Sequence, residues 1–179
     1  MLYPAALRDT LLRLALRNLY RPHWSAQIID EVTRNLREHR GLTADQAQRL
    51  TSALANHFCE AAVTGYEDLI PGLTCQEKDR HVLAAAIRAH ATLIVTFNLK
   101  DFPSDSLQPH TIKAQHPDVF LVQLFSRDPE AIVESLREQA AALQRPSMRF
   151  ERVLETLEQH VPDFVRQVRQ YLQEALARS

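Results

Sequence analysis

The chain has 179 residues, 45% of them hydrophobic and 24% charged, a composition typical of one water-soluble globular domain with or without a helical appendage. Its three glycines, Gly41, Gly65 and Gly72, are too few and too widely spaced for a glycine-rich phosphate loop, and they argue against an all-β fold. The 21 basic and 22 acidic residues give a net charge of −1, which excludes a histone-like polycation.

Three further features of the sequence bear on function. Residues 1–40 carry seven arginines against four acids, a local excess of positive charge that points weakly to an anionic partner, and coding bias equally explains the preference for Arg over Lys. Cys59 and Cys75 lack zinc-site spacing and predict reduced thiols in the cytoplasm. No apolar run approaches the roughly 20 residues of a membrane span, so no membrane partner is expected.

The first 58 residues predict three helices. Leucines recur at helical spacing in the first, and Ser25 and Thr43 are good N-caps for the second and third. Their expected ranges are 5–19, 26–39 and 44–58.

The pattern then changes to short apolar strands that alternate with helices. The expected strands are 61–64, 92–96 and 111–114, and a helix is expected over 80–90. This alternation predicts an α/β fold with a parallel sheet wrapped by helices.

Everything after about residue 116 is expected to be helical. The expected helices are 116–125, 129–144, 150–160 and 163–178, with a break at Pro146. We therefore predict two domains, residues 1–126 with the sheet and residues 127–179 as a helical carboxyl-terminal extension.

Acidic side chains occur on three segments, either where an element begins or ends or beside the apolar face of a helix. They are Asp30 and Glu31 on helix 26–39, Glu77 and Asp79 before helix 80–90, and Asp101 after strand 92–96, where Thr96 and Asn98 also lie. In parallel α/β folds, function gathers at the carboxyl ends of strands. Carboxylates that cluster repel each other unless a cation lies between them, and oxygen ligands favour Mg²⁺ or Mn²⁺. If these acids converge, they predict a metal-dependent nuclease.

Each residue also has a simpler explanation. Asp79 could be only the N-cap of its helix, and Asp101 could cap a one-turn helix. Asn98 could occupy a left-handed turn position, and Glu31 could be a solvated residue on an arginine-bearing helix. Spacing alone leaves these alternatives open.

Four segments, in the correct order, resemble PIN-domain proteins, and most closely the branch of VapC-like toxins with a helical carboxyl-terminal extension. The segments are Leu2-Tyr3-Pro4-Ala5-Ala6-Leu7-Arg8-Asp9, Trp24-Ser25 through Ile28-Ile29-Asp30-Glu31, Asp79-Arg80-His81-Val82-Leu83-Ala84-Ala85-Ala86, and Val95-Thr96-Phe97-Asn98-Leu99-Lys100-Asp101-Phe102. The resemblance covers about residues 2–120.

The resemblance implies a three-layer α/β/α fold and a metal-dependent endoribonuclease, commonly the toxin of a type II toxin–antitoxin pair. It implies Glu31, Asp79 and Asp101 as catalytic residues, which with Asn98 would hold one or two Mg²⁺ or Mn²⁺ ions, supported by Thr96. Arg8 and Arg80 are implied phosphate contacts. The implied partners are an RNA substrate and a cognate antitoxin, and a second copy of the chain is also compatible with the resemblance.

The sequence departs from the family pattern at its start. The family begins with an apolar strand that ends in a metal-binding aspartate, shortly before the segment that Leu2-Tyr3-Pro4 resembles. Asp9 cannot replace that aspartate, because it lies a turn or more into the first predicted helix. We expect either a start codon assigned too late or a truncated, catalytically impaired member that binds RNA or a protein partner without cleavage.

Overall fold

The computed structural model describes residues 4–142 and 150–177. By internal contacts these residues group into two compact units. The sheet unit is Arg21–Gln115, and the helical unit joins the described parts of Leu2–Tyr20 and His116–Ser179. Residues Leu2 and Tyr3 of the family-like start and the predicted break at Pro146 lie outside the described residues. In the described part of the chain, no helix combines the length and apolarity that crossing a membrane requires.

The sheet unit contains two pairs of short parallel strands. Strand β1 (Trp24–Ser25) pairs with β2 (Ala62–Val63), with Trp24 opposite Ala62. Strand β3 (Leu93–Val95) pairs with β4 (Lys113–Gln115), with Ile94 opposite Ala114. The parallel α/β class is therefore confirmed, although the chain is mostly helical and the predicted three-layer arrangement remains a prediction.

Helices surround these strands. They are α2 (Ala26–Arg40), α3 (Ala44–His57), α4 (Arg80–Arg88) and the one-turn α5 (Ser104–Leu107), with 3₁₀ turns at Cys59–Ala61, Glu67–Gly72, Glu77–Asp79, Leu99–Asp101 and Gln108–His110. Ser25 Oγ accepts from the Ile28 amide at 3.3 Å, and Thr43 forms a capping box with Gln46, as expected from their cap positions. Gly41 ends α2 with φ +66°, a left-handed conformation that glycine adopts without strain.

Helix α4 supplies the centre of the sheet unit's core. Leu83, Ala84 and Ala85 are buried in one apolar cluster with Ile94 of β3 and Val63 of β2. Helix α4 contacts both β1 and β3. Helix α4 therefore holds the segments next to β1 and β3 in place, and these segments carry the candidate site.

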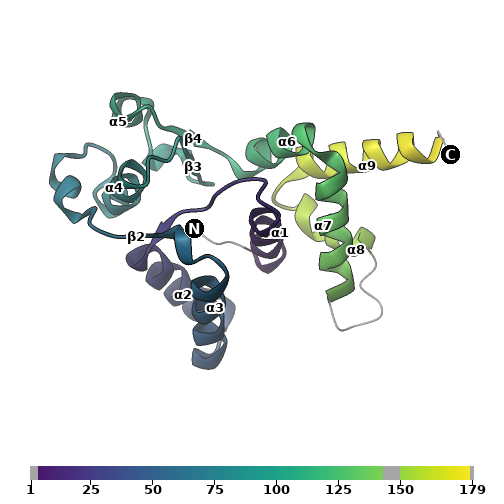
Figure 1. Ribbon diagram of the computed structural model, residues 1–179, viewed down its shortest axis with the longest axis horizontal. Coiled ribbons are helices and arrows are strands. Elements are labelled where there is room, and N and C mark those ends of the chain that lie inside the picture. Colours follow the sequence, from purple (N-terminus) through teal and green to yellow (C-terminus); the bar gives the residue numbers. More distant parts are fainter. Residues whose placement is uncertain (1–3, 143–149, 178–179) are drawn as a thin grey trace. The chain divides into compact units, whose positions relative to one another are not determined.

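The described residues of the helical unit form five helices. They are α1 (Ala5–Leu16), α6 (Pro117–Arg127), α7 (Pro129–Ala142), α8 (Phe150–Glu158) and α9 (Pro162–Ala177). Helix α1 packs beside α7 and α8, and α6 packs along α9 (Figure 1). The core contains Leu7 and Leu14 from α1 and Phe164 from α9, all fully buried.

Two features of α1 differ from expectation. The helix ends at Leu16 rather than near residue 19, because the chain turns at Asn18, which has φ +60°. Its Thr10 hydroxyl lies 2.7 Å from Gln139 Oε1 of α7, so α1 groups with the carboxyl-terminal helices. The predicted domain division, 1–126 and 127–179, remains a prediction, since a unit defined by contacts need not be a unit that folds alone.

Candidate active site

Asp79 and Asp101 come together from two 3₁₀ turns of the sheet unit. Asp79 ends the turn Glu77–Asp79 that leads into α4, and Asp101 ends the turn Leu99–Asp101 that follows β3. The Gln76 amide donates to the Asp101 carbonyl at 3.4 Å, which ties one turn to the other. Both carboxylates contact the ammonium of Lys78, whose Nζ lies 2.8 Å from Asp101 Oδ2 and 3.5 Å from Asp79 Oδ2.

The two acids differ in their electrostatic environment. Burial raises the pKa of Asp79, and the nearby Asp101 carboxyl raises it further. The hydrogen bond from Lys78 is the main factor that lowers the pKa of Asp101. Both side chains are largely buried, with 14% and 13% of their surface exposed, and Asp79 Oδ2 accepts no hydrogen bond from the described residues. The site thus holds two shielded carboxylates that share one positive charge.

Asn98 and Thr96 shape the turn that carries Asp101. The Asn98 side-chain amide donates to Asp101 Oδ2, and the Asn98 backbone amide donates to Thr96 Oγ1 at 3.1 Å. Thr96 is fully buried, and its own amide donates to the Gln115 carbonyl at 2.9 Å, next to the end of β4. These bonds hold the turn at the carboxyl end of β3, the edge where function is expected in a parallel sheet.

The simpler explanations for these residues do not match the geometry. Asp79 precedes α4, yet its side chain makes no capping hydrogen bond. Asn98 has φ −101°, outside the left-handed region. Asp101 ends its own turn, and its carboxylate contacts Lys78 and Asn98 instead of capping α5.

Glu31 contacts helix α4 through His81. It is half-buried on α2, and its Oε2 lies 3.3 Å from Nε2 of the buried His81 on α4. Among residues 4–142 and 150–177, no group of three or more His, Cys, Asp or Glu side chains has metal-binding geometry. Asp101 therefore contacts Asn98 and shares the Lys78 ammonium with Asp79, Glu31 contacts His81, and the roles of these residues as metal ligands remain predictions.

His81 and Lys78 are the neighbours that sequence reasoning missed. His81 occupies a buried position of α4, two residues after Asp79, and a histidine on an otherwise alanine-rich helix face was the available signal. Lys78 directly precedes Asp79, but its position gave no indication that it would also contact Asp101, 23 residues later.

The two predicted phosphate contacts lie in different units. Arg80 begins α4, and its Nε donates to the Cys75 carbonyl at 3.4 Å. Arg8 is half-buried on α1 in the helical unit, where burial lowers the pKa of its guanidinium. Both roles remain predictions.

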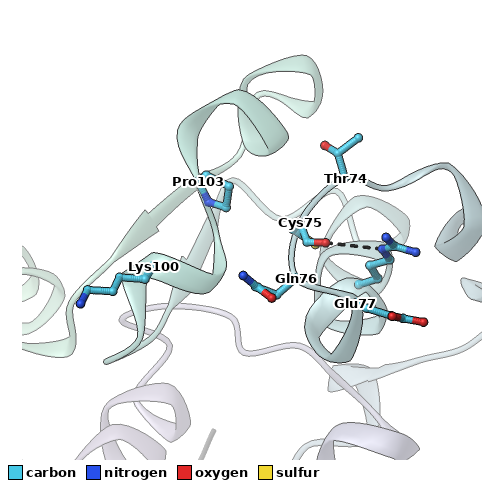
Figure 2. A pocket seen from close by; sticks show the side chains of 7 residues that line it. Thr74, Cys75, Gln76, Glu77, Lys100 and Pro103 are labelled. Atoms are coloured by element: carbon cyan, nitrogen blue, oxygen red, sulfur yellow. Dashed lines mark hydrogen bonds between the residues drawn. The ribbon is translucent and has the colours of Figure 1, made fainter.

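An open pocket of about 280 Å³ lies beside Arg80. Figure 2 shows its two walls, one carrying Thr74, Cys75, Gln76 and Glu77 and the other carrying Lys100 and Pro103. Gln76 points from its own wall toward the opposite one, whereas the Lys100 ammonium points outward (Figure 2). The pocket adjoins the two acid-bearing turns, since Glu77 and Lys100 belong to them.

Residues 2–100 match the family model described as PIN domain, and residues 117–170 match the one described as VapC50 C-terminal domain. The chain is 40% identical over 119 residues to a Mycobacterium tuberculosis protein named "Putative ribonuclease VapC50", an alignment that covers 66% of this chain and 70% of that protein. No solved structure matches the chain significantly. Because the PIN match spans more than half of the chain, the protein belongs to the PIN-domain family, in a VapC-like group with a carboxyl-terminal extension.

Proposed function

We propose that the protein is a divalent-metal-dependent endoribonuclease of PIN type and the toxin of a type II toxin–antitoxin pair. The observation that carries this proposal is the contact network of Asp79, Asp101, Lys78 and Asn98 at the carboxyl end of β3. The name of the 40% identical relative, which is called a ribonuclease, supports the reaction type.

The donor set fits a hard cation. Asp79 Oδ2 is a buried oxygen without a hydrogen bond from the described residues, and the Asp101 carboxylate, which accepts from the Asn98 amide, shares the Lys78 ammonium with it. Mg²⁺ commonly takes one or two carboxylates and completes its coordination with water and substrate phosphate. Asp79 and Asp101 would therefore hold the ion, with Asn98 as a further ligand or as the group that orients Asp101.

The remaining candidates would act on the substrate and on the carboxylates. A bound Mg²⁺ or Mn²⁺ would supply an activated water and charge stabilisation for phosphodiester hydrolysis. Thr96 would keep the turn in place through its hydroxyl, and Arg80 would contact an RNA phosphate from the start of α4. Glu31 would be a further ligand of the ion, and Nε2 of the buried His81 lies 3.3 Å from its carboxylate. Arg8 stays a candidate phosphate contact on α1.

A second candidate function has its own observation. Only two carboxylates meet at the site, and no three-residue metal cluster is found in the described part of the chain. This favours a catalytically impaired PIN-like protein that binds RNA or a protein partner without cleavage.

The experiment that separates the two uses the full chain and a long single-stranded RNA, with Mg²⁺ or Mn²⁺ titrated and then chelated. The proposal expects metal-dependent internal cleavage. Asp79→Asn and Asp101→Asn should each reduce it at least about a hundredfold, since each variant removes one of the two carboxylate ligands of the proposed site. Asp105→Asn is the matched control, because Asp105 is an exposed acid close to Asp101 whose described hydrogen bond is with Ser104. RNA binding without cleavage at any metal concentration would support the second function instead.

The toxin role is tested in cells. Induced expression of the chain should arrest bacterial growth, and Asp79→Asn should relieve the arrest. A cognate antitoxin encoded next to it, a cytoplasmic location and a homodimer belong to the same proposal. Growth arrest that Asp79→Asn leaves unchanged would contradict it.

A further inference from the structure

The ammonium of Lys78 lies against the two carboxylates that are the proposed ligands of the cation. It is 2.8 Å from Asp101 Oδ2 and 3.5 Å from Asp79 Oδ2. Without it, two largely buried carboxylates would face each other with no compensating charge. Lys78 thus supplies one positive charge to the pair while no other cation is bound.

The side chain that brings this charge is weakly held. It is 67% exposed, whereas those of Asp79 and Asp101 are 14% and 13% exposed. Exposed lysine ion pairs are individually weak, and the lysine stem is flexible. The ammonium can therefore leave the carboxylates without disturbing the packing of the fold.

A divalent ion and this ammonium cannot share the pair. The ammonium lies against Oδ2 of both Asp79 and Asp101, and a divalent ion held by the same two carboxylates would bring a second positive charge next to it, which the ammonium would repel. We propose that Lys78 is a tethered competitor of the divalent cation, bound to the Asp79–Asp101 pair when no cation is present and displaced when one binds. This inference rests on the proposed metal site and adds a device that sets its affinity.

The first consequence concerns affinity. Part of the binding free energy of the ion is used to displace the ammonium, so the chain binds more weakly than the same carboxylates would without Lys78. Lys78→Met keeps an unbranched side chain and removes the charge. From the usual strength of exposed ion pairs, we expect Lys78→Met to bind Mn²⁺ about three- to tenfold more tightly.

Lys100→Met is the matched control. Lys100 lies in the turn Leu99–Asp101, next to Asp101, and is exposed with no ion pair among the residues that the structure describes. Removing it changes the net charge by the same amount and at nearly the same place. A general electrostatic effect would change the Mn²⁺ affinity of both variants equally. Competition for the carboxylates would change the affinity of Lys78→Met far more than that of Lys100→Met.

The affinity is measured by titrating the full-length chain with Mn²⁺ and following the free ion by electron paramagnetic resonance. Tighter binding by Lys78→Met, with Lys100→Met within about twofold of wild type, is the expected result. Equal or weaker binding by Lys78→Met, while Asp101→Asn abolishes binding, would overturn the competitor role and leave the proposed metal site standing. No Mn²⁺ binding by either wild type or Lys78→Met would remove the metal site, and the inference with it.

The displacement itself can be observed in the wild-type chain, because the sequence has only three lysines, Lys78, Lys100 and Lys113. Reductive ¹³C-methylation keeps their charge and gives each a separate nuclear magnetic resonance signal. Saturating Mg²⁺ should move the Lys78 signal toward its position in the Asp79→Asn/Asp101→Asn double variant and leave the other two unchanged. A Lys78 signal that stays in place while Mg²⁺ binds would refute displacement.

Discussion

Replacement of Asp118 should destabilise the helical unit more than replacement of other acids there. Asp118 lies in the first turn of α6 and is 6% exposed. Its two carboxylate oxygens accept the backbone amides of Asp163 and Phe164 at 3.0 and 2.8 Å. These amides belong to the first turn of α9, where N–H groups have no partner within the helix. Asp118 therefore caps α9 from a distant part of the sequence.

The magnitude follows from these two bonds. Asp118→Ala leaves two amides unpaired, one of them on Phe164, which is fully buried in the core. Unpaired buried donors and lost charge-assisted bonds together predict a loss of about 2 to 4 kcal/mol in the free energy of unfolding. For a chain of this size that corresponds to a fall in Tm of roughly 5 to 12 °C. Asp118→Asn keeps one acceptor oxygen, so about half of that loss is expected.

The assay combines urea unfolding, followed by circular dichroism, with hydrogen exchange of the Phe164 amide. The matched control is Glu130→Ala, an exposed acid in the first turn of α7, which should stay within about 0.5 kcal/mol of wild type. Faster exchange at Phe164 in Asp118→Ala would show that the start of α9 has loosened. If Asp118→Ala unfolds like wild type and its Phe164 amide exchanges at the same rate, the capping argument is wrong.

Three further predictions concern the acid pair and its surroundings. Without divalent metal at pH 7.5, Asp79→Asn should raise Tm by about 1 to 4 °C, because burial raises the pKa of Asp79 and so disfavours its ionised form in the fold. A lower Tm of this variant in differential scanning fluorimetry would contradict the prediction. Lys78 lowers the pKa of Asp101 from 3.8, so the ionised Asp101 stabilises the fold above pH 4, and this contribution is lost as the pH falls through the lower pKa of the folded state. In urea titrations, the difference in unfolding free energy between wild type and Asp101→Asn should therefore shrink from pH 7 to pH 3. A constant difference would argue against the ion pair. Arg80→Ala, made in the Asp79→Asn background, should weaken RNA binding. It should also reduce the slope of log affinity against log salt concentration by about 0.7, the value for one phosphate contact on a single strand. An unchanged slope would exclude Arg80 as a phosphate contact.

Local signals were enough to predict most elements of the chain. Ser25 and Thr43 begin α2 and α3, and Asp128 caps α7 by accepting from the Ala131 amide at 3.0 Å. Such caps act within three residues, so sequence alone identifies them. Strand β3 was predicted within a residue at each end because its run of apolar β-branched residues is bounded by polar turns. Strand β1 was missed because two residues, Trp24 and Ser25, carry no alternating pattern.

The contacts of the candidate site were predicted only in part. The turn from Thr96 to Asp101 is local, and its internal hydrogen bonds span two or three residues. The convergence of Asp79 with Asp101 was expected from their places at the ends of elements, and the structure has both in contact with Lys78. The predicted association of Glu31 with this pair depends on how α2 is held against α4, where Glu31 contacts His81, and it remains a prediction.

The sequence by itself determined the longer helices, the strands β2, β3 and β4 and the acidic turns, since these depend on caps, periodicity and residues a few positions apart. Only the tertiary structure decided which distant side chains meet: Lys78 on Asp101, His81 on Glu31, and Asp118 on the start of α9. These contacts join residues 23 to 50 positions apart, and they form because packed apolar faces bring their elements together. Periodicity shows which face of a helix is apolar but not which partner covers it, so the polar contacts at the edges of those faces could not be predicted from the chain.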